Sequence, residues 1–268
     1  MSINNDELKK CEDKLSFVVG KDSKGNIVRA SFLELPHLLI AGATGTGKSP
    51  FVLTLLENLL KKNTKDELKV YIINPHEIEF KDYINCPQVA QNKVFSKPDE
   101  VIEVLETLCV EMKKRYELFA NKDVSNYDEY NKKAKKKLAK IIVLIHEYND
   151  YVLSDCKNKF FEYLLKLVML SRAAGIHIVL ATQRIYEQTI TREILMQFPT
   201  KIAFAMRKEE SKLILGNDDA EYLVCGRELI FKNDFNNDFY QRLESFFDFK
   251  EYNDSNSRYL FSREEVID

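Results

Sequence analysis

The chain has 268 residues, of which 45% are apolar and 31% are charged, and its formal net charge is −2. This length accommodates one large domain or two small ones, and we expect a single core. The balance of residue types is typical of a soluble globular protein and excludes a disordered chain. The longest apolar runs are far shorter than the roughly 20 residues that span a bilayer, and the N-terminus lacks the pattern of a secretory signal. We therefore expect a cytoplasmic protein without a membrane segment.

Strand and helix patterns alternate along most of the chain. Residues 15–30 predict a hairpin with its turn at residues 24–26, and residues 37–41 form an apolar run typical of a strand buried on both faces. Further strands are predicted at residues 69–73, 141–145, 176–181 and 201–206. Helices are predicted after Lys48 and at residues 99–120, 126–139 and 158–174. An antiparallel pair is predicted at residues 227–245, with its turn near Asn236 and Asn237. The alternation predicts an α/β fold with a mainly parallel sheet, helices on both faces, an N-terminal hairpin and C-terminal antiparallel strands.

The junction between the strand at residues 37–41 and the following helix carries the sequence GATGTGKS, which fits the P-loop pattern. Its glycines allow backbone N–H groups to converge on phosphates, and the helix N-terminus adds partial positive charge. Lys48 is expected to contact the β- and γ-phosphates of ATP, and the Ser49 hydroxyl is expected to bind Mg²⁺. A turn without a ligand would need neither side chain. The predicted nucleotide-binding residues are Gly42, Ala43, Thr44, Gly45, Thr46, Gly47, Lys48, Ser49 and Pro50.

A second half of the site is predicted where the strand at residues 141–145 ends in His146 and Glu147. Glu147 fits the residue that orients the attacking water, and both positions are candidates for the magnesium site. An aspartate is expected where His146 stands, and an imidazole cannot replace its charge, although Asp150 could partly compensate. We therefore expect weak hydrolysis that decreases as the pH falls through about 6.5, the ordinary pKa of histidine. The alternative is that His146 is an ordinary strand-end residue in a slow or binding-only site.

Several stretches of the chain resemble the FtsK/SpoIIIE family of DNA motors, and the similarity runs from about residue 15 to residue 248. The matching residues are 20–22 (GKD), 36–49 (PHLLIAGATGTGKS), 111–116 (EMKKRY), 172–184 (RAAGIHIVLATQR) and 201–204 (KIAF). The resemblance implies a RecA-like ATPase core at residues 36–250, with a hairpin extension at residues 1–35 packed on it and a tail at residues 251–268. It also implies assembly as a homo-hexameric ring that moves double-stranded DNA or, in the type VII secretion branch, helps to export proteins.

The resemblance also assigns roles to two further side chains. Gln183 is similar to the residue that senses the γ-phosphate, although a strand-end amide bonded to a loop would look the same. Arg172 is similar to the arginine supplied to a neighbouring subunit's nucleotide, with an exposed helix-end arginine as the alternative. The chain departs from the family at four positions, which are Asn74 (usually Asp), His76 (usually Lys), His146 (usually Asp) and Ile185 (usually Pro).

Contacts with DNA are implied for two segments, residues 121–137 and 184–193. The candidate residues are Lys132, Lys133, Lys135, Lys136, Lys137, Arg184, Thr189, Thr191 and Arg192. They would contact the DNA backbone without reading the base sequence. For the lysine run the alternative is a solvated helix face, and the near-zero net charge favours neither interpretation.

Three functions remain open at this point. The first is an ATP-dependent double-stranded DNA translocase of a mobile element, acting in conjugative transfer, plasmid replication or partition with accessory proteins of that element. The second is an ATPase similar to those of type VII secretion, with a protein substrate. The third is a nucleotide-binding assembly protein with slow hydrolysis.

Overall fold

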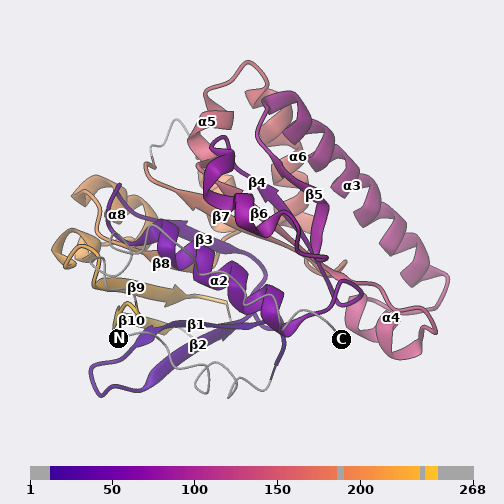
Figure 1. Cartoon of the computed structure of the whole chain (residues 1–268), viewed down its shortest axis with the longest axis horizontal. Helices are drawn as coiled ribbons and strands as arrows, with labels where there is room; N and C mark the ends of the chain where they lie inside the picture. The colour runs from indigo at the N-terminus through magenta and orange to yellow at the C-terminus, as the bar shows by residue number, and fades with distance from the viewer. Residues whose placement is uncertain (1–12, 186–189, 236–238, 247–268) are drawn as a thin grey trace.

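The computed structural model describes residues 13–185, 190–235 and 239–246, and their strands form one ten-stranded sheet. The order across the sheet is β2-β1-β10-β9-β8-β3-β7-β6-β4-β5 (Figure 1). The six strands from β8 to β5 are parallel, and the remaining four pair in antiparallel fashion. The strands are β1 (Ser16–Lys21), β2 (Ile27–Ser31), β3 (Leu38–Ala41), β4 (Leu68–Ile73), β5 (Val89–Phe95), β6 (Lys140–His146), β7 (Ile176–Thr182), β8 (Thr200–Ala203), β9 (Glu228–Asn233) and β10 (Phe239–Glu244).

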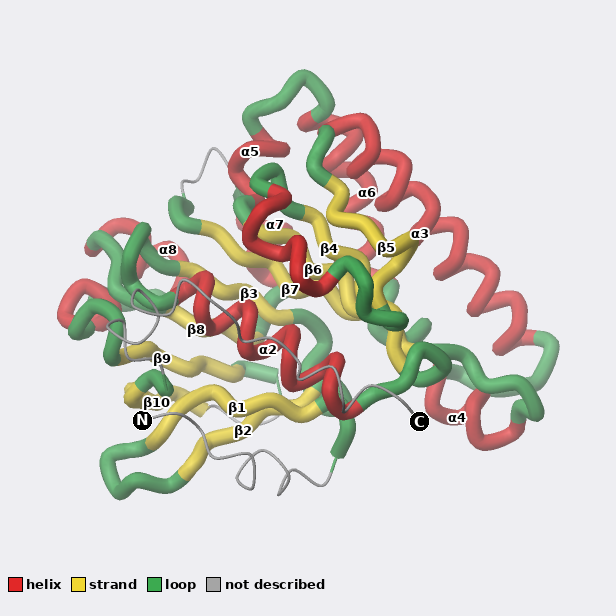
Figure 2. Tube along the Cα trace, viewed as in Figure 1, coloured by secondary structure: helices red, strands yellow, loops and turns green. Residues whose placement is uncertain are grey.

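Helices cover both faces of this sheet (Figure 2). One face packs against α2 (Lys48–Lys62) and the 3₁₀ helix η1 (Glu77–Tyr83). The other face packs against α3 (Pro98–Ala120), α4 (Tyr127–Lys133), α5 (Tyr148–Val152), α6 (Lys157–Leu170), α7 (Arg192–Met196), α8 (Lys208–Leu215) and the 3₁₀ helix η2 (Asp219–Tyr222). The predicted α/β fold is confirmed. Among the described residues, no helix is both long enough and apolar enough to span a membrane.

The central strands are continuous apolar runs because both of their faces are buried. Every residue of β6 and of β7 is buried. Along β6, Ile141, Val143 and Ile145 face the core under α3 and α6, and the intervening Ile142 and Leu144 face the core under α2. Burial on both faces is the reason that these strands lack the polar alternation of a half-exposed sheet.

Several segments differ from the elements that the sequence predicts. Residues 89–95 form β5, which sequence patterns do not predict because its centre is polar and Gln91 and Asn92 adopt positive φ angles of 57° and 48°. The helix predicted at residues 126–139 ends at Lys133, because the Asn131 side chain bonds both backbone groups of Leu138 and turns the chain back. The helix predicted at residues 158–174 ends at Leu170, and the turn predicted near residues 236–237 lies outside the described residues.

The N-terminal hairpin forms as predicted and continues the sheet, since β1 pairs with β10 through Lys21 and Glu244. Its apolar side chains do not form a core of their own. Phe17 and Phe32 are fully buried in the same cluster as Leu55 and Leu59 of α2. The hairpin therefore shields one end of the helix that follows the glycine-rich loop.

Arg115 of α3 holds together the loops that precede β6 and β7. Its guanidinium donates to the carbonyl oxygens of Ala174 at 2.8 Å and Ala139 at 2.9 Å, and its Nε donates to the Glu111 carboxylate at 2.9 Å. The side chain is only 3% exposed. A buried guanidinium with three acceptors positions two loops that precede central strands, and this explains a basic residue on an otherwise apolar helix face.

We predict that Arg115→Met lowers the free energy of unfolding by about 3 kcal/mol, because two buried carbonyl groups lose their donors at a cost of roughly 1–3 kcal/mol each. Urea unfolding followed by circular dichroism measures this change. Lys114→Met, which alters an exposed residue of the same helix, is the control and should change stability by less than about 0.5 kcal/mol. Equal stabilities of the two variants would contradict the role of Arg115.

Two buried histidines lie where β3 and β7 begin. His37 Nδ1 accepts a hydrogen bond from the Ile178 N–H at 3.0 Å, and His177 Nδ1 lies 2.8 Å from the Pro36 carbonyl oxygen, to which it must donate. Burial lowers the pKa of both imidazoles to about 3, with nearby Arg172 acting on His37 and Lys140 on His177 in the same direction. Both rings are therefore neutral in the folded protein at neutral pH.

We predict that stability decreases as the pH falls below about 6.5, where the unfolded chain binds protons that the folded chain does not. Each buried histidine contributes a slope of roughly 1.4 kcal/mol per pH unit. Urea unfolding between pH 7.5 and 5.0 measures the slope. His177→Asn, whose amide can replace the donor to Pro36, should reduce the slope by about 1.4 kcal/mol per pH unit, which is the contribution of one proton. His76→Gln, which replaces an exposed histidine, is the control, and an equal change of slope in this variant would contradict the role of burial.

Candidate nucleotide-binding site

The glycine-rich loop after β3 has a backbone that requires glycine. Its first two N–H groups donate to carbonyl oxygens, Gly42 to Thr182 at the end of β7 at 3.3 Å and Ala43 to Ala205 just after β8 at 3.0 Å. A Cβ on Gly42 would lie 2.6 Å from Phe204 Cβ, so this position has no room for a side chain. Gly45 has a φ of +79° and faces open space, which leaves the centre of the loop accessible to a ligand.

The loop leads directly into α2 and leaves the N-terminus of that helix open. Gly47, at a φ of 105°, is the residue before the helix, and it provides no side-chain cap. No acidic residue occupies the first turn, where Pro50 lacks an N–H that would otherwise need a partner. Uncapped N–H groups and the helix dipole favour an anion at this point, so the loop fits the predicted phosphate cradle.

Four residues predicted separately form one hydrogen-bonded network. Lys48 Nζ donates to Glu147 Oε1 at 2.9 Å, and the two side chains are only 3% and 10% exposed. Gln183 Nε2 donates to the same carboxylate oxygen at 2.5 Å, and Gln183 Oε1 accepts from the Thr44 hydroxyl at 2.6 Å. The glycine-rich loop, the end of β6 and the end of β7 are therefore joined around one carboxylate.

Strand order explains this convergence. β7 lies between β3 and β6, with Ala41 opposite Thr182 and Ala181 opposite His146. The carboxyl ends of the three parallel strands thus meet at one edge, where α/β proteins bind their ligands. Glu147 has left-handed backbone angles (φ 55°, ψ 52°), which cost about 1–3 kcal/mol for a residue with a side chain. Such strain is typical of residues held at functional sites.

His146 lies at the predicted site, but its charge differs from the expectation. The ring is fully buried, with Nε2 located 3.4 Å from Ser49 Oγ and 3.5 Å from Lys48 Nζ. Burial lowers the pKa of His146 to about 2, and the positive charge of Lys48 contributes in the same direction. The imidazole is therefore neutral near pH 6.5, so protonation of His146 does not support the decrease in turnover expected there.

Glu79 is a carboxylate at this site that sequence patterns do not reveal. It lies on η1, and its Oε2 is 3.2 Å from His146 Nδ1 and accepts a hydrogen bond from Asn74 Nδ2 at 3.2 Å. Burial raises the pKa of Glu79 above its ordinary value, whereas Lys48 acts in the opposite direction. In the sequence, the departures from the family at Asn74 and His76 are the features that draw attention to the loop that carries Glu79. Asp150, the expected substitute, is exposed and makes no hydrogen bond or ion pair with His146 within the described structure.

A magnesium ion at this site would depend on the nucleotide as well as the protein. Within residues 13–185, 190–235 and 239–246, no group of three or more His, Cys, Asp or Glu side chains could hold a metal ion. The half-buried Ser49 hydroxyl beside His146 fits a single protein ligand, as in P-loop sites where phosphates and water complete the coordination.

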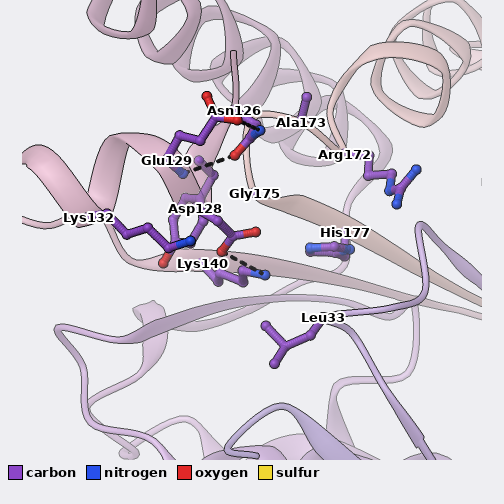
Figure 3. A pocket seen from close by; sticks show the side chains of 11 residues that line it. Leu33, Asn126, Asp128, Glu129, Lys132, Lys140, Arg172, Ala173, Gly175 and His177 are labelled. Carbon is purple, nitrogen blue, oxygen red and sulfur yellow. Dashed lines mark hydrogen bonds and ion pairs between the residues drawn. The ribbon is translucent and has the colours of Figure 1, made fainter. Parts of the chain in front are cut away.

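Arg172 lies at the opposite edge of the sheet, in the turn before β7. Its guanidinium stacks on the Phe235 ring, 4.1 Å from the ring centroid. It borders a pocket of about 470 Å³ between this turn, α4 and Leu33 (Figure 3). The seven residues of β7 span roughly 20 Å at about 3.3 Å per residue, so Arg172 is far from its own chain's phosphate cradle.

The two segments predicted to contact DNA also lie at different edges. Lys132 and Lys133 are at the end of α4 and the other three lysines follow it, all exposed near the amino ends of β6 and β7. At the other edge, the Arg184 carbonyl accepts from Asn149 Nδ2, and Thr191 caps α7, which begins with Arg192. Thr189 lies outside the described residues. The structure therefore does not combine the two sets into one surface.

The fold and these side chains define the class of the protein. A glycine-rich loop between a buried strand and a helix, with Lys48 paired to a glutamate at the end of a nearby strand, is the site of a P-loop NTPase. The FtsK/SpoIIIE family model matches residues 2–187, and the chain belongs to this family. The predicted resemblance is thus confirmed.

Relatives and solved structures agree with this assignment. The chain is 35% identical to the DNA translocase FtsK of Clostridium tetani over 235 residues, covering 85% of this chain and 31% of that protein. It is 36% identical over 231 residues to the DNA translocase FtsK of Caldanaerobacter subterraneus, covering 85% and 32%. The chain therefore spans about a third of the length of these relatives.

Two solved structures share the fold. The first is the pCW3 conjugation coupling protein TcpA in its monomer form with ATPγS, at a TM-score of 0.79 and 24% identity, covering 94% of this chain and 71% of that chain. The second is the cytoplasmic domain of the type VII secretion ATPase EccC of Thermomonospora curvata, at a TM-score of 0.74 and 22% identity, covering 87% and 28%.

Proposed function

We propose that the chain hydrolyses ATP to move along double-stranded DNA, as the motor of a mobile element in conjugative transfer, plasmid replication or partition. The observation that carries this proposal is the network of Thr44, Lys48, Glu147 and Gln183 around one buried carboxylate. DNA is favoured over a protein substrate because the relatives named DNA translocases are 35–36% identical, whereas the secretion ATPase is 22% identical.

The network suggests how ATP binding prepares hydrolysis. Lys48 would exchange the Glu147 carboxylate for the β- and γ-phosphates, which are stronger partners for an ammonium group in the same buried setting. The released Glu147 could then orient the attacking water, while Gln183 connects it to Thr44 of the loop. Mg²⁺, held by Ser49 and the phosphates, would offset the negative charge that develops during phosphoryl transfer.

The position of Arg172 supports a ring assembly. Since this arginine lies roughly one strand length from its own phosphate cradle, it could act only on a neighbouring subunit's nucleotide. We therefore propose a homo-hexamer in which Arg172 leaves Phe235 and contacts the adjacent γ-phosphate. Native mass spectrometry with nucleotide and duplex DNA tests this assembly, and a monomer under all conditions would contradict it.

One alternative function has a specific observation in its favour. The neutral His146 places no negative charge where P-loop motors carry an aspartate, and this favours an assembly protein that binds ATP but turns it over slowly. Steady-state ATPase rates distinguish the two proposals. Binding of ATP without turnover, with or without duplex DNA, would support the assembly protein.

We predict that Glu147→Gln retains ATP binding but lowers turnover by roughly 100-fold or more, the contribution typical of a group that activates a nucleophile. Binding of a fluorescent ATP analogue and phosphate release should be measured side by side. Lys48→Ala is the comparison variant, and it should lose both properties because the phosphates lose their charge-assisted partner. Normal turnover in Lys48→Ala would show that this loop is not the catalytic site.

We predict that duplex DNA stimulates ATP hydrolysis and that replacing the five lysines at positions 132, 133, 135, 136 and 137 with alanine weakens DNA binding. The slope of log affinity against log salt should become shallower by nearly one for each DNA phosphate that a lysine no longer neutralises. A matched control replaces the exposed Lys113 and Lys114 of α3. Basal ATPase activity without stimulation by DNA would instead favour a protein substrate, and an unchanged salt slope would mean that the lysine run is a solvated surface.

A further inference from the structure

We propose that Glu79 is a positioning residue that acts through His146, so that a carboxylate–imidazole pair performs the role usually filled by one aspartate. In this pair Glu79 accepts the Nδ1–H of His146, and Nε2 presents its lone pair to Ser49. The effect of Glu79 on hydrolysis rests on the proposed ATPase function. The hydrogen bond between Glu79 and His146 concerns only side chains of this chain and does not depend on that function.

The surroundings of Nε2 decide which ring nitrogen carries the proton. Lys48 Nζ lies 3.5 Å from Nε2, and an ammonium group has only N–H donors to offer. A hydrogen on Nε2 would point toward that cation, whereas a lone pair is attracted to it. The Ser49 hydroxyl, 3.4 Å away, can donate to the same lone pair. The neutral ring must therefore carry its proton on Nδ1.

The Nδ1–H then needs an acceptor, because an unsatisfied buried donor costs about 1–3 kcal/mol. Within the described residues Nδ1 is buried and has no partner with hydrogen-bond geometry. The nearer of two carboxylate oxygens is Glu79 Oε2 at 3.2 Å, and the other is Glu147 Oε1 at 3.9 Å. Glu147 Oε1 already accepts from Lys48 and Gln183, so Glu79 is the available acceptor.

The neighbours of this pair hold both partners near the required positions. Asn74 Nδ2 donates to the Glu79 oxygen that faces the ring, and the same nitrogen donates to the His76 carbonyl at 2.6 Å. The Phe80 ring packs edge-on against the imidazole, with 5.5 Å between ring centroids. The Glu79 side chain is 38% exposed, so its carboxylate has space to rotate into line with Nδ1–H.

The consequence is an acceptor where an aspartate oxygen would otherwise lie. A carboxylate that accepts from one imidazole nitrogen fixes the tautomer and makes the other nitrogen a better acceptor. Nε2 could thereby hold the Ser49 hydroxyl with its oxygen turned toward the phosphate cradle. Removing such a supporting partner typically costs 10–100-fold in affinity or activity.

The first test needs neither nucleotide nor metal. Nitrogen-15 NMR of the chain, which has four histidines, should show His146 as the Nδ1–H tautomer at neutral pH, assigned by its loss in His146→Asn. In Glu79→Met, which removes the acceptor 3.2 Å from Nδ1, the Nδ1 signal should shift because its hydrogen bond is lost. Glu77→Met changes an exposed residue of the same 3₁₀ helix and should leave the His146 signals unchanged. An Nε2–H tautomer in the unsubstituted chain, or no change in Glu79→Met, would overturn the proposal.

The second test uses ATP hydrolysis and a double-mutant cycle. Glu79→Met should lower kcat by about ten-fold with little change in KM, and Glu79→Gln, which keeps an acceptor oxygen, should recover part of the loss. In a His146→Asp background Glu79→Met should change kcat by less than about two-fold, since the aspartate no longer needs a partner. The same ten-fold loss in that background would contradict action through His146. Failure of DNA to stimulate hydrolysis would count against the proposed function and would leave the NMR result standing.

Discussion

The site depends on one constraint, which is that three buried parallel strands end at the same edge of the sheet. β3, β7 and β6 are adjacent, and their ends place Lys48, Gln183 and Glu147 within hydrogen-bond distance. The apolar residues of these strands pack on both faces, so the edge cannot shift without disturbing two cores. The ion pair between Lys48 and Glu147 is buried at this edge, and it would be costly if either partner were removed alone.

The electrostatics of the site follow from burial more than from residue type. A histidine in place of an aspartate suggested a cation beside the metal site, but a fully buried ring next to a lysine stays neutral. The carboxyl group nearest to this ring is that of Glu79 on the 3₁₀ helix η1, whose Oε2 lies 3.2 Å from His146 Nδ1. The residues usual in the family at positions 74, 76 and 146 are all replaced here, so three neighbouring positions of the site differ together from the family pattern.

The two edges of the sheet have separate roles in the proposed motor. The carboxyl edge carries the phosphate cradle, and the amino edge carries Arg172, the lysine run after α4 and the pocket between them. A strand length separates the edges, so residues at the amino edge could serve nucleotide chemistry only across a subunit boundary. This geometry is consistent with the proposed ring assembly.

The sequence alone determined the fold class and the phosphate cradle, because apolar periodicity and the glycine pattern are local properties of short segments. It also predicted Glu147 from its place at the end of a buried strand and Gln183 through the family resemblance. Local patterns failed at β5, whose centre is polar, and at the end of α4, where Asn131 bonds a residue seven positions later. Only the tertiary structure decided the charge of His146 and the approach of Glu79. Burial and the distance between residues far apart in sequence depend on strand order and packing, and no local pattern encodes either of them.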